Sequence, residues 1–338
     1  MGEYARSLAI AHAARRRWQD ADIHFILSRQ APYAGSAPFP ATLLASSPTF
    51  HSAAVVELMD KFRPDVVIFD NAGRTAQLRA GQQGGARVVY VSARSRQRRK
   101  AFRLSWMRLI DEHWIAYPEF LAGRLNYFER FKLHALGRPV MRFLDVILSR
   151  TGDSPRASIL ARVGCDAGSY VLVVPGGGTG HPRATDAILA FLEAARALAE
   201  RGVATVFVGP TGAANAGLSD SPLRCVDSLP QPDLADLMRG ARLIVANGGS
   251  TLLQAIACGG ACVAIAIARD QGERIRRCVD AGVAVAATLD AANILHTAAG
   301  LLQNEALRAG LAQRAAALKL ADGLEVAIEA LSRLLETK

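Results

Sequence analysis

The sequence lacks the features that mark membrane-spanning, metal-binding and disulfide-bonded proteins. Its 338 residues contain no run of about 18 consecutive apolar residues, so no membrane-spanning helix is expected. The five cysteines form no Cys-x-x-Cys pair and no Cys/His spacing of a metal site, so we expect reduced thiols, no metal site and no cofactor. The opening residues also lack the basic-then-apolar layout of a secretory signal. These absences favour a cytoplasmic protein.

Acidic side chains are scarce relative to basic ones, with 30 Asp and Glu against 40 Lys and Arg. The excess is concentrated at Arg94–Arg108, where Phe102 and Trp106 are interleaved with basic residues. This segment has three interpretations: a solvated loop whose apolar residues face the core, contact with an anionic membrane at its inner face, or a nucleic-acid site. No zinc, RRM or KH signature accompanies it, so we expect no nucleic-acid partner.

Apolar residues make up 51% of the chain, which is enough for two cores. Short apolar runs such as Val66–Phe69 and Val88–Val91 alternate with helical patterns, as in parallel sheets covered on both faces. The pattern predicts an α/β protein with two parallel-sheet domains. In the first half we expect strands at 22–27, 65–69 and 87–91, and helices at 8–18 and 53–62. In the second half we expect strands at 170–174, 204–208, 243–246 and 262–267, and helices at 185–201, 234–240 and 251–258.

A polar, turn-rich segment from Ser149 to Arg156 separates the two halves. We place an N-terminal domain at 1–148, a linker at 149–168 and a C-terminal domain at 169–323. The amphipathic tail at 324–338 is expected to form a helix that packs back on the first domain.

Residues Gly2–Ala11 look like the turn and helix that follow the first strand of a doubly wound sheet, yet only Met1 precedes them. We therefore expect that the first strand lies upstream of Met1 or is supplied otherwise.

The most informative segment runs from Ala241 to Gln271 and is predicted to form a strand, a turn, a helix, a second strand and an Asp-Gln pair. Unpaired N–H groups and two hydroxyls meet where the helix begins, which suits a phosphate. An acceptor and an amide follow the second strand, at the sheet edge where open α/β sheets bind ligands, which suits sugar hydroxyls. The residues concerned are Asn247, Gly248, Gly249, Ser250 and Thr251 in the turn and helix start, and Asp270 and Gln271 after the second strand.

A second glycine turn, Pro175–Pro182, also lies between a strand and a helix. It lacks the third glycine of a Rossmann fingerprint and the Lys-Ser/Thr of a P-loop, and such a turn can be purely structural. Because it is paired with the first turn in the same sheet, we expect ligand contacts from Gly177, Gly178, Thr179 and His181.

These motifs resemble the donor domain of GT-B glycosyltransferases, most nearly the family 28 group that includes MurG, and the PseG-like nucleotide-sugar hydrolases. The resemblance implies two Rossmann-like domains facing a cleft, with diphosphate at Ser250-Thr251 and sugar at Asp270-Gln271. Gln254 stands where the family has a ribose-binding Glu, and it lacks the charge that strengthens such bonds. The base pocket would lie at Val226–Pro230, which a plain loop before a helix capped by Asp233 explains equally well.

The resemblance extends to the first half, where Gly2–Ala11 is similar to the Gly-His-x-x-Arg-x-Leu-Ala-x-Ala opening of PseG, with Glu3 replacing the histidine. An acid/base role is implied there, although Glu at a helix start is also a dipole partner. Asp70 closes a buried strand and is a second base candidate, or the N-cap of a helix at 75–80. The Asp20-Ala-Asp22 string matches a metal-binding pattern but precedes a strand, on the edge opposite the ligand.

The resemblance thus implies an inverting, metal-independent glycosyltransferase. It would move a sugar from a nucleotide diphospho-sugar to a glycan, lipid-linked or other surface-polysaccharide acceptor in the cleft. The resemblance implies that the nucleotide is UDP. Glu3 or Asp70 would deprotonate the acceptor hydroxyl, while Ser250, Thr251 and nearby N–H groups stabilise the leaving diphosphate. Two further functions stay open: a hydrolase in which water replaces the acceptor, and a non-catalytic nucleotide-sugar binding or assembly subunit.

Overall fold

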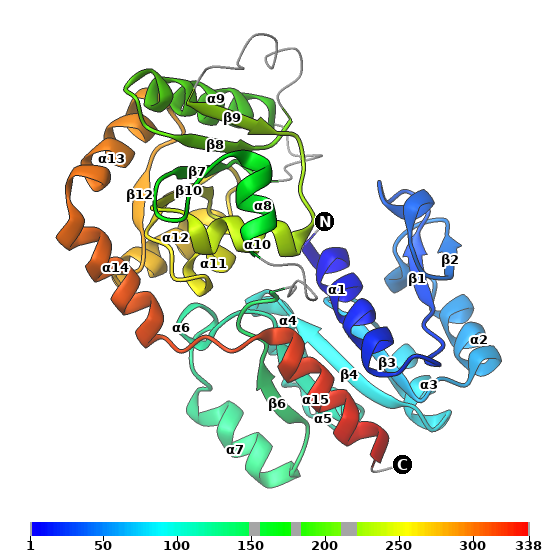
Figure 1. Cartoon of the computed structure of the whole chain (residues 1–338). Helices are drawn as coiled ribbons and strands as arrows, with labels where there is room; N and C mark the ends of the chain where they lie inside the picture. The colour runs from blue at the N-terminus through cyan, green and yellow to red at the C-terminus, as the bar shows by residue number, and fades with distance from the viewer. Residues whose placement is uncertain (1, 149–155, 177–183, 211–221, 337–338) are drawn as a thin grey trace. The chain divides into compact units, whose positions relative to one another are not determined.

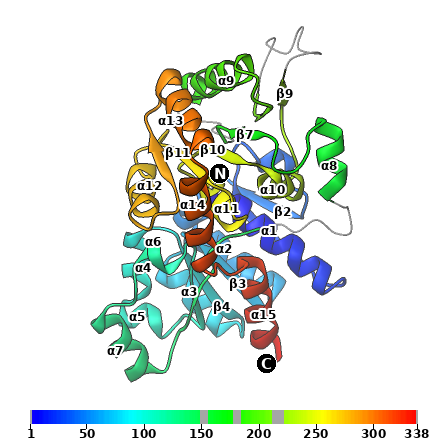
Figure 2. The ribbon, with the colours of Figure 1, turned by 60° about the vertical axis from the view of Figure 1, so that its left-hand side comes forward.

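The computed structural model describes residues 2–148, 156–176, 184–210 and 222–336. The chain forms two compact units: unit 1 comprises Met1–Ile147 and Ala321–Lys338, and unit 2 comprises Leu148–Leu320. Figures 1 and 2 show the elements of each unit in two views.

Unit 1 is built on four parallel strands in the order β3-β4-β5-β6, and two further parallel strands, β1 and β2, form a separate pair. Side chains Val88–Val91 of β4 are fully buried, as expected for an apolar strand covered on both faces. The strands are β1 Phe25–Ser28, β2 Ala41–Leu44, β3 Val66–Asp70, β4 Arg87–Ser92, β5 Glu112–Ile115 and β6 Val140–Phe143. The helices are α1 Gly2–Arg17, α2 Ser52–Phe62, α3 Thr75–Gln83, α4 Ser95–Ala101, α5 Leu104–Met107, α6 Glu119–Ala122, α7 Tyr127–Leu136 and α15 Gly323–Glu336, with 3₁₀ turns at Ala34–Ser36 and Pro48–Phe50.

Two apolar cores hold unit 1 together. The C-terminal helix α15 lies beside α1 (Figure 1), and Leu331 of α15 shares a core with Ile10 of α1 and Trp114 of β5. In the second core, Met59 of α2 packs with Trp106 of α5 and with residues of β3 and β4. The tail of the chain is therefore a structural part of unit 1.

Unit 2 is a six-stranded parallel sheet in the order β12-β11-β10-β7-β8-β9. The strand order reverses between β7 and β10, and such a switch point is where open α/β sheets bind ligands. The strands are β7 Val171–Val174, β8 Thr205–Val208, β9 Leu223–Val226, β10 Leu243–Asn247, β11 Cys262–Ile265 and β12 Val285–Ala287. The helices are α8 Arg156–Val163, α9 Ala184–Glu200, α10 Gln231–Gly240, α11 Ser250–Ala257, α12 Gln271–Asp280, α13 Ala291–Gln303 and α14 Glu305–Ala317.

The expected strands and helices all occur, but the periodicity does not predict β2, β5, β6, β9 or β12. A polar residue interrupts the short apolar run in β2, β5, β6 and β9, and β12 has only three residues. Residues 156–163 of the expected linker form α8, which packs on α10. Ile159 and Val163, four residues apart, bury one face of this helix.

Candidate functional site

The candidate site in unit 2 begins where two adjacent strands end. β7 pairs with β10 from Val171 opposite Leu243 onward, so the turns that follow both strands lie at the same edge. Asn247 joins these turns: its Nδ2 donates to the Pro175 carbonyl at 2.5 Å, and its Oδ1 accepts from the Gly249 N–H at 2.7 Å. The structure thus brings Pro175-Gly176 and Asn247–Gly249 together, while Gly177, Gly178, Thr179 and His181 lie outside the described residues.

Gly176 makes the close approach of the two turns feasible. Its φ is +82°, and a Cβ built there would lie 1.8 Å from Asn247 Nδ2. Gly248 is also constrained, because a Cβ would meet Ile275 Cδ1 at 2.5 Å. Packing alone therefore requires glycine at both positions.

α11 begins at this place without a side-chain cap. Gly249 is the N-cap residue and supplies no side-chain hydrogen bond, and Ser250 and Thr251 open the helix. The first N–H groups of a helix have no partner within it, and the helix end carries partial positive charge. With the exposed Ser250 and the half-buried Thr251 beside them, these groups can hold a phosphate or diphosphate.

Arg274 adds a full positive charge to this edge. Its Nη1 donates to the Gly248 carbonyl at 2.6 Å, and its Nη2 lies 3.3 Å from Asp270 Oδ2. The Arg274 side chain is only 12% exposed, so the charge is held in place. Its sequence signal is the spacing: Arg274 follows Asp270 by four residues, one helical turn, so both lie on the same helix face.

The other predicted ligand contacts in unit 2 have partners within the protein. Gln271 accepts from the Ile267 N–H at 2.8 Å, and Gln254 donates to Gln231 Oε1 at 2.9 Å. The Asp270 side chain is 75% exposed. Gln271 nevertheless reaches the first turn, because its Nε2 lies 3.7 Å from a Cβ built at Gly249. The helix start, Arg274 and Gln271 therefore share one edge of the sheet.

Val226–Pro230, the predicted base pocket, leads from β9 to α10. Pro230 is the N-cap residue of α10, and Asp233 lies inside the first turn, where it pairs with Arg162 at 3.1 Å. The interpretation of Asp233 as the cap is therefore wrong. The helix begins earlier, at Gln231, because Pro232 fits the first turn of a helix, where its missing N–H costs no hydrogen bond. A base contact in this segment stays a prediction.

In unit 1, the candidate base Asp70 is held in an ion pair. Arg6 donates to both carboxylate oxygens, at 2.9 and 2.5 Å, and Ser7 Oγ donates to Oδ2 at 3.1 Å. Burial raises the pKa of Asp70, and the Arg6 guanidinium opposes that rise. Asp70 is not a helix cap either, since α3 is capped at Arg74. Its contacts fasten α1 to β3 and leave it poorly placed to accept a proton.

Glu3 is the more accessible carboxylate. It lies in the first turn of α1 with its side chain 47% exposed, and its Oε1 accepts from Asn71 Nδ2 at 2.9 Å and lies 3.8 Å from Arg94 Nη2. Asn71 has a φ of +52° and accepts from the Ala93 N–H, which joins the turns after β3 and β4. Glu3 thus lies at the carboxyl edge of the unit 1 sheet. This position is compatible with a role as a base and with a role as a partner of the α1 dipole.

The Arg94–Arg108 segment has a core face and a solvent face. Phe102 and Trp106 are buried, and buried Arg98 forms a bidentate pair with Glu129 of α7. The exposed basic residues are Arg94, Arg96, Arg99, Arg103 and Arg108. The apolar residues other than Leu104 therefore face the core, as in the first of the three interpretations.

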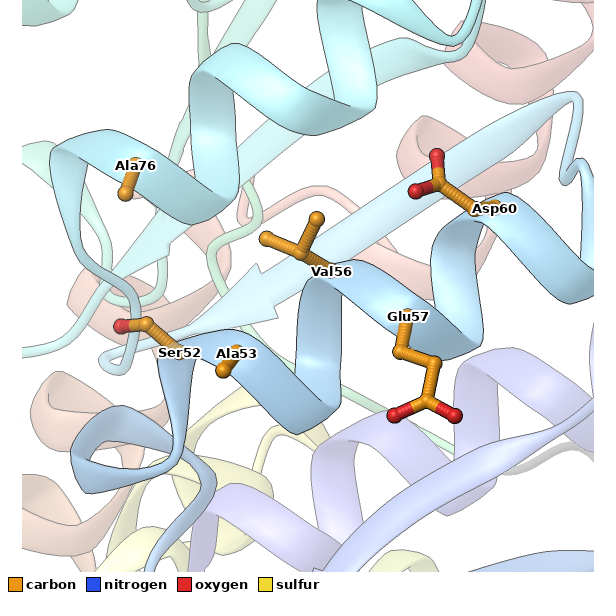
Figure 3. Close-up of a pocket in the computed structure, with 6 residues that line it drawn as sticks. All are labelled: Ser52, Ala53, Val56, Glu57, Asp60 and Ala76. Atoms are coloured by element: carbon orange, nitrogen blue, oxygen red, sulfur yellow. The ribbon is translucent and has the colours of Figure 1, made fainter.

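Two surface hollows include none of the predicted site residues. One, of about 470 Å³, lies on α2 and α3 and is lined by Ser52, Ala53, Val56, Glu57, Asp60 and Ala76 (Figure 3). The other, of about 320 Å³, is formed by Tyr127, Arg130, Phe131 and His134 of α7. Within the described ranges, no group of three His, Cys, Asp or Glu side chains could hold a metal ion. No helix in those ranges is long and apolar enough to cross a bilayer.

Comparison with known proteins identifies a family and a fold for this chain. Residues 129–324, more than half of the chain, match the family model described as UDP-N-acetylglucosamine 2-epimerase, whereas no curated protein matches. A putative UDP-N-acetylglucosamine 2-epimerase from Listeria monocytogenes is 17% identical, with a TM-score of 0.56, over 89% of this chain and 84% of that chain. Spinosyn rhamnosyltransferase SpnG is 17% identical, with a TM-score of 0.62, over 98% and 95%. Phytolacca americana UGT2, complexed with UDP-2fluoro-glucose and pterostilbene, is 13% identical, with a TM-score of 0.65, over 98% and 97%.

The structural matches have low identity and show the fold alone, and they confirm the GT-B assignment made from the motifs. The family match refines that assignment in a direction that the MurG and PseG resemblance does not anticipate. The chain, with its two Rossmann-like parallel-sheet units, has the GT-B fold and belongs to the UDP-N-acetylglucosamine 2-epimerase family.

Proposed function

We propose that the protein is an inverting, metal-independent glycosyltransferase that uses a UDP-sugar bound in unit 2. The observation that carries this proposal is the uncapped start of α11 beside Arg274. When the bond from the anomeric carbon to the diphosphate breaks, its electron pair goes to the departing phosphate oxygen. The N–H groups of Ser250 and Thr251 and the Arg274 guanidinium stabilise that charge. They supply the electrostatic role that a divalent cation fills in other transferases.

The acceptor hydroxyl needs one base, and Glu3 is the better candidate in unit 1. Glu3 is half exposed, whereas both oxygens of Asp70 are bridged to Arg6 and Ser7. One carboxylate is sufficient for a single displacement, in which the acceptor attacks as the diphosphate leaves and the anomeric configuration inverts. Of the two candidate bases in unit 1, Glu3 is the accessible one, which suits a transfer that needs a single base.

A UDP-N-acetylglucosamine 2-epimerase is the second candidate, and the family match favours it. Epimerisation removes the proton from C2 of the sugar and returns one on the opposite face, so it calls for a second acid/base group. Asp70, whose pKa is raised by burial, would have to fill that role despite its pairing with Arg6. A nucleotide-sugar hydrolase or a non-catalytic binding subunit would use the same diphosphate site in unit 2, and product analysis separates these functions.

We also propose that the acceptor is anionic or lipid-linked and that unit 1 contacts an anionic membrane. The exposed arginines of Arg94–Arg108 supply attraction, and Tyr127, Phe128 and Phe131 of the neighbouring α7 are 70%, 72% and 59% exposed. Vesicle flotation should show binding to anionic but not neutral lipid, reversed by salt and weakened when the three aromatic residues are changed to serine. Equal recovery with both lipids would contradict this contact.

The decisive experiment follows products from a panel of UDP-sugars by chromatography. If the protein is a transferase, UDP is released only when an acceptor is present. Formation of the 2-epimer of the UDP-sugar without an acceptor and without accumulation of UDP would establish epimerisation. Formation of free sugar and UDP without an acceptor would establish hydrolysis. The variant Glu3→Gln should lower kcat at least about 100-fold, as expected for loss of a general base. Glu325→Gln, in the first turn of α15, is the matched control for helix-dipole effects and should leave the rate unchanged.

A further inference from the structure

Four basic side chains gather at the carboxyl edge of the unit 1 sheet, on the segments that follow β3 and β4. Arg74 follows β3 and is the N-cap residue of α3. Arg96 and Lys100 belong to α4, which follows β4, and Arg103 is the N-cap residue of α5. These four side chains are called the cationic cluster.

Three members of the cationic cluster lie on one face of the same segment. Lys100 follows Arg96 by four residues and precedes Arg103 by three, and these spacings bring side chains together on a helix. The Arg103 N–H donates to the Lys100 carbonyl at 3.1 Å, so the helical turn continues as far as Arg103. Like charges at such spacings destabilise a helix. The stability of α4 therefore does not explain this arrangement.

Lys100 connects this segment to the turn that holds Arg74. Its Nζ donates to the carbonyl of Gly73, the residue before Arg74, at 3.0 Å and lies 4.1 Å from the centre of the Trp106 ring. The ring is itself fixed, because Trp106 Nε1 donates to Thr75 Oγ1 at 3.0 Å. An ammonium has three N–H donors, so at least one donor of this half-buried group remains for a ligand.

No carboxylate neutralises the cationic cluster in the described part of unit 1. None of its members takes part in an ion pair there, whereas Arg94 and Arg98 of the same segment pair with Glu3 and Glu129. The repulsion between the members is therefore not offset by a counter-charge from the protein.

The electrostatics of Lys100 show that the four charges act on one another. Burial lowers the pKa of Lys100, and the guanidinium groups of Arg74, Arg103 and Arg96 lower it further. A bound anion would relieve both effects, because it supplies the missing counter-charge and accepts hydrogen bonds from the ammonium.

We propose that the cationic cluster binds a phosphate group of the acceptor; that the ligand is the acceptor rests on the proposed transferase function. A phosphate monoester carries a charge of about −1.5 to −2 and three acceptor oxygens, which suits cations that approach from separate elements. A carboxylate carries a single charge and is matched by the planar fork of one arginine. The arrangement of one fixed lysine among three arginines therefore favours phosphate.

The cationic cluster lies at the same sheet edge as the candidate base Glu3. Arg94, the N-cap residue of α4, lies 3.8 Å from Glu3 Oε1, and Lys100 is about 9 Å further along the axis of α4. An acceptor with its phosphate at Lys100 can therefore present a hydroxyl to Glu3. A sugar phosphate, free or lipid-linked, carries both groups and is the substrate class that this site fits.

Acylation of lysines by acetic anhydride, located by mass spectrometry of the full chain, reads this site without catalysis. Saturating inorganic phosphate should slow the acylation of Lys100 at least about fivefold and leave the exposed Lys61 of α2 unchanged. Phosphate bound in unit 2 does not enter this readout, and chloride at the same ionic strength controls for screening. Equal rates at Lys100 in phosphate and in chloride would overturn the proposal.

A pair of exposed arginines tests the contribution of charge. Arg96→Gln should raise the phosphate concentration that gives half-protection of Lys100 at least about threefold. The matched control Arg79→Gln, exposed on α3 and outside the cationic cluster, should leave that concentration unchanged. Equal effects of the two substitutions would contradict a defined site.

Two further ligands separate the sources of the phosphate. Protection of Lys100 by glucose 1-phosphate would identify a soluble sugar phosphate, and protection only by phosphatidylcholine vesicles that contain phosphatidic acid would identify a lipid-linked one. Protection by neither would overturn the proposal. If product analysis shows epimerisation while inorganic phosphate still protects Lys100, the transferase function fails and the phosphate site stands.

Discussion

Replacement of Gly176 by alanine should damage the candidate site more than its stability cost alone would suggest. Alanine at a φ of +82° costs about 1–2 kcal/mol of backbone strain. The new Cβ would also lie 1.8 Å from Asn247 Nδ2 and would break the bonds of this amide to Pro175 and Gly249. A buried polar group left without its partner costs about 1–3 kcal/mol, so the strain and the two broken bonds together should cost about 3–8 kcal/mol.

Gly168→Ala is the matched control. Gly168 has a φ of +81° in the same unit, and nothing lies within 4 Å of a Cβ built there. This control should lose only the strain energy of about 1–2 kcal/mol, as measured by urea unfolding followed by circular dichroism. Gly176→Ala should in addition weaken UDP binding at least about 10-fold in calorimetry, because the turn before α11 moves. Equal unfolding energies and equal UDP affinities for the two variants would refute the role of the Asn247 bridge.

Three further predictions concern charge. Arg274→Ala should weaken UDP binding about 10-fold or more and reduce its salt dependence, whereas Arg276→Ala, exposed on the same helix, should not; titration at two salt concentrations checks this. Arg142→Met should cost about 3–5 kcal/mol of unfolding free energy because it strands the buried Glu112 carboxylate, whereas Arg276→Met should cost less than about 1 kcal/mol; equal losses in urea would contradict this. Burial lowers the pKa of His113 to about 3, so the folded state keeps this imidazole neutral while the unfolded state takes up a proton below about pH 6.5. The free energy of unfolding should therefore fall by about 1.4 kcal/mol per pH unit between about pH 6.5 and 3. His113→Gln should flatten this slope when unfolding is measured at pH 7, 5.5 and 4.5.

Local patterns predict much of the fold. The strand β10, its glycine turn and α11 are recognisable because apolar run, turn residues and helix opening follow each other within a dozen residues. β5 is not recognisable, because Glu112 and His113 look like surface residues. Both are buried since Arg142 pairs with Glu112 and Ser92 bonds to His113, partners that are 30 and 21 residues away. Partners this far apart in the sequence cannot be recognised from a local pattern, so the burial of these two polar side chains is not predicted.

The candidate site shows the same limit. The sequence predicts that Ser250 and Thr251 open a helix at the sheet edge, and they do. It does not predict the Arg6 guanidinium that occupies Asp70, 64 residues away, or the Asn247 amide that bridges to Pro175, 72 residues away. Both depend on which strands become neighbours, a property of the whole sheet and not of any local pattern.

The central claim is that the start of α11 binds the diphosphate of a nucleotide, and calorimetric titration of uridine, UMP and UDP tests it most directly. UDP should bind at least about 10-fold more tightly than UMP, and uridine weakly. Ser250→Ala and Thr251→Ala should each reduce the UDP preference, while the control Thr297→Ala, on the exposed side of α13, should leave it unchanged. Equal affinities for the three ligands, or a UDP preference that survives both α11 substitutions, would contradict the assignment of this site.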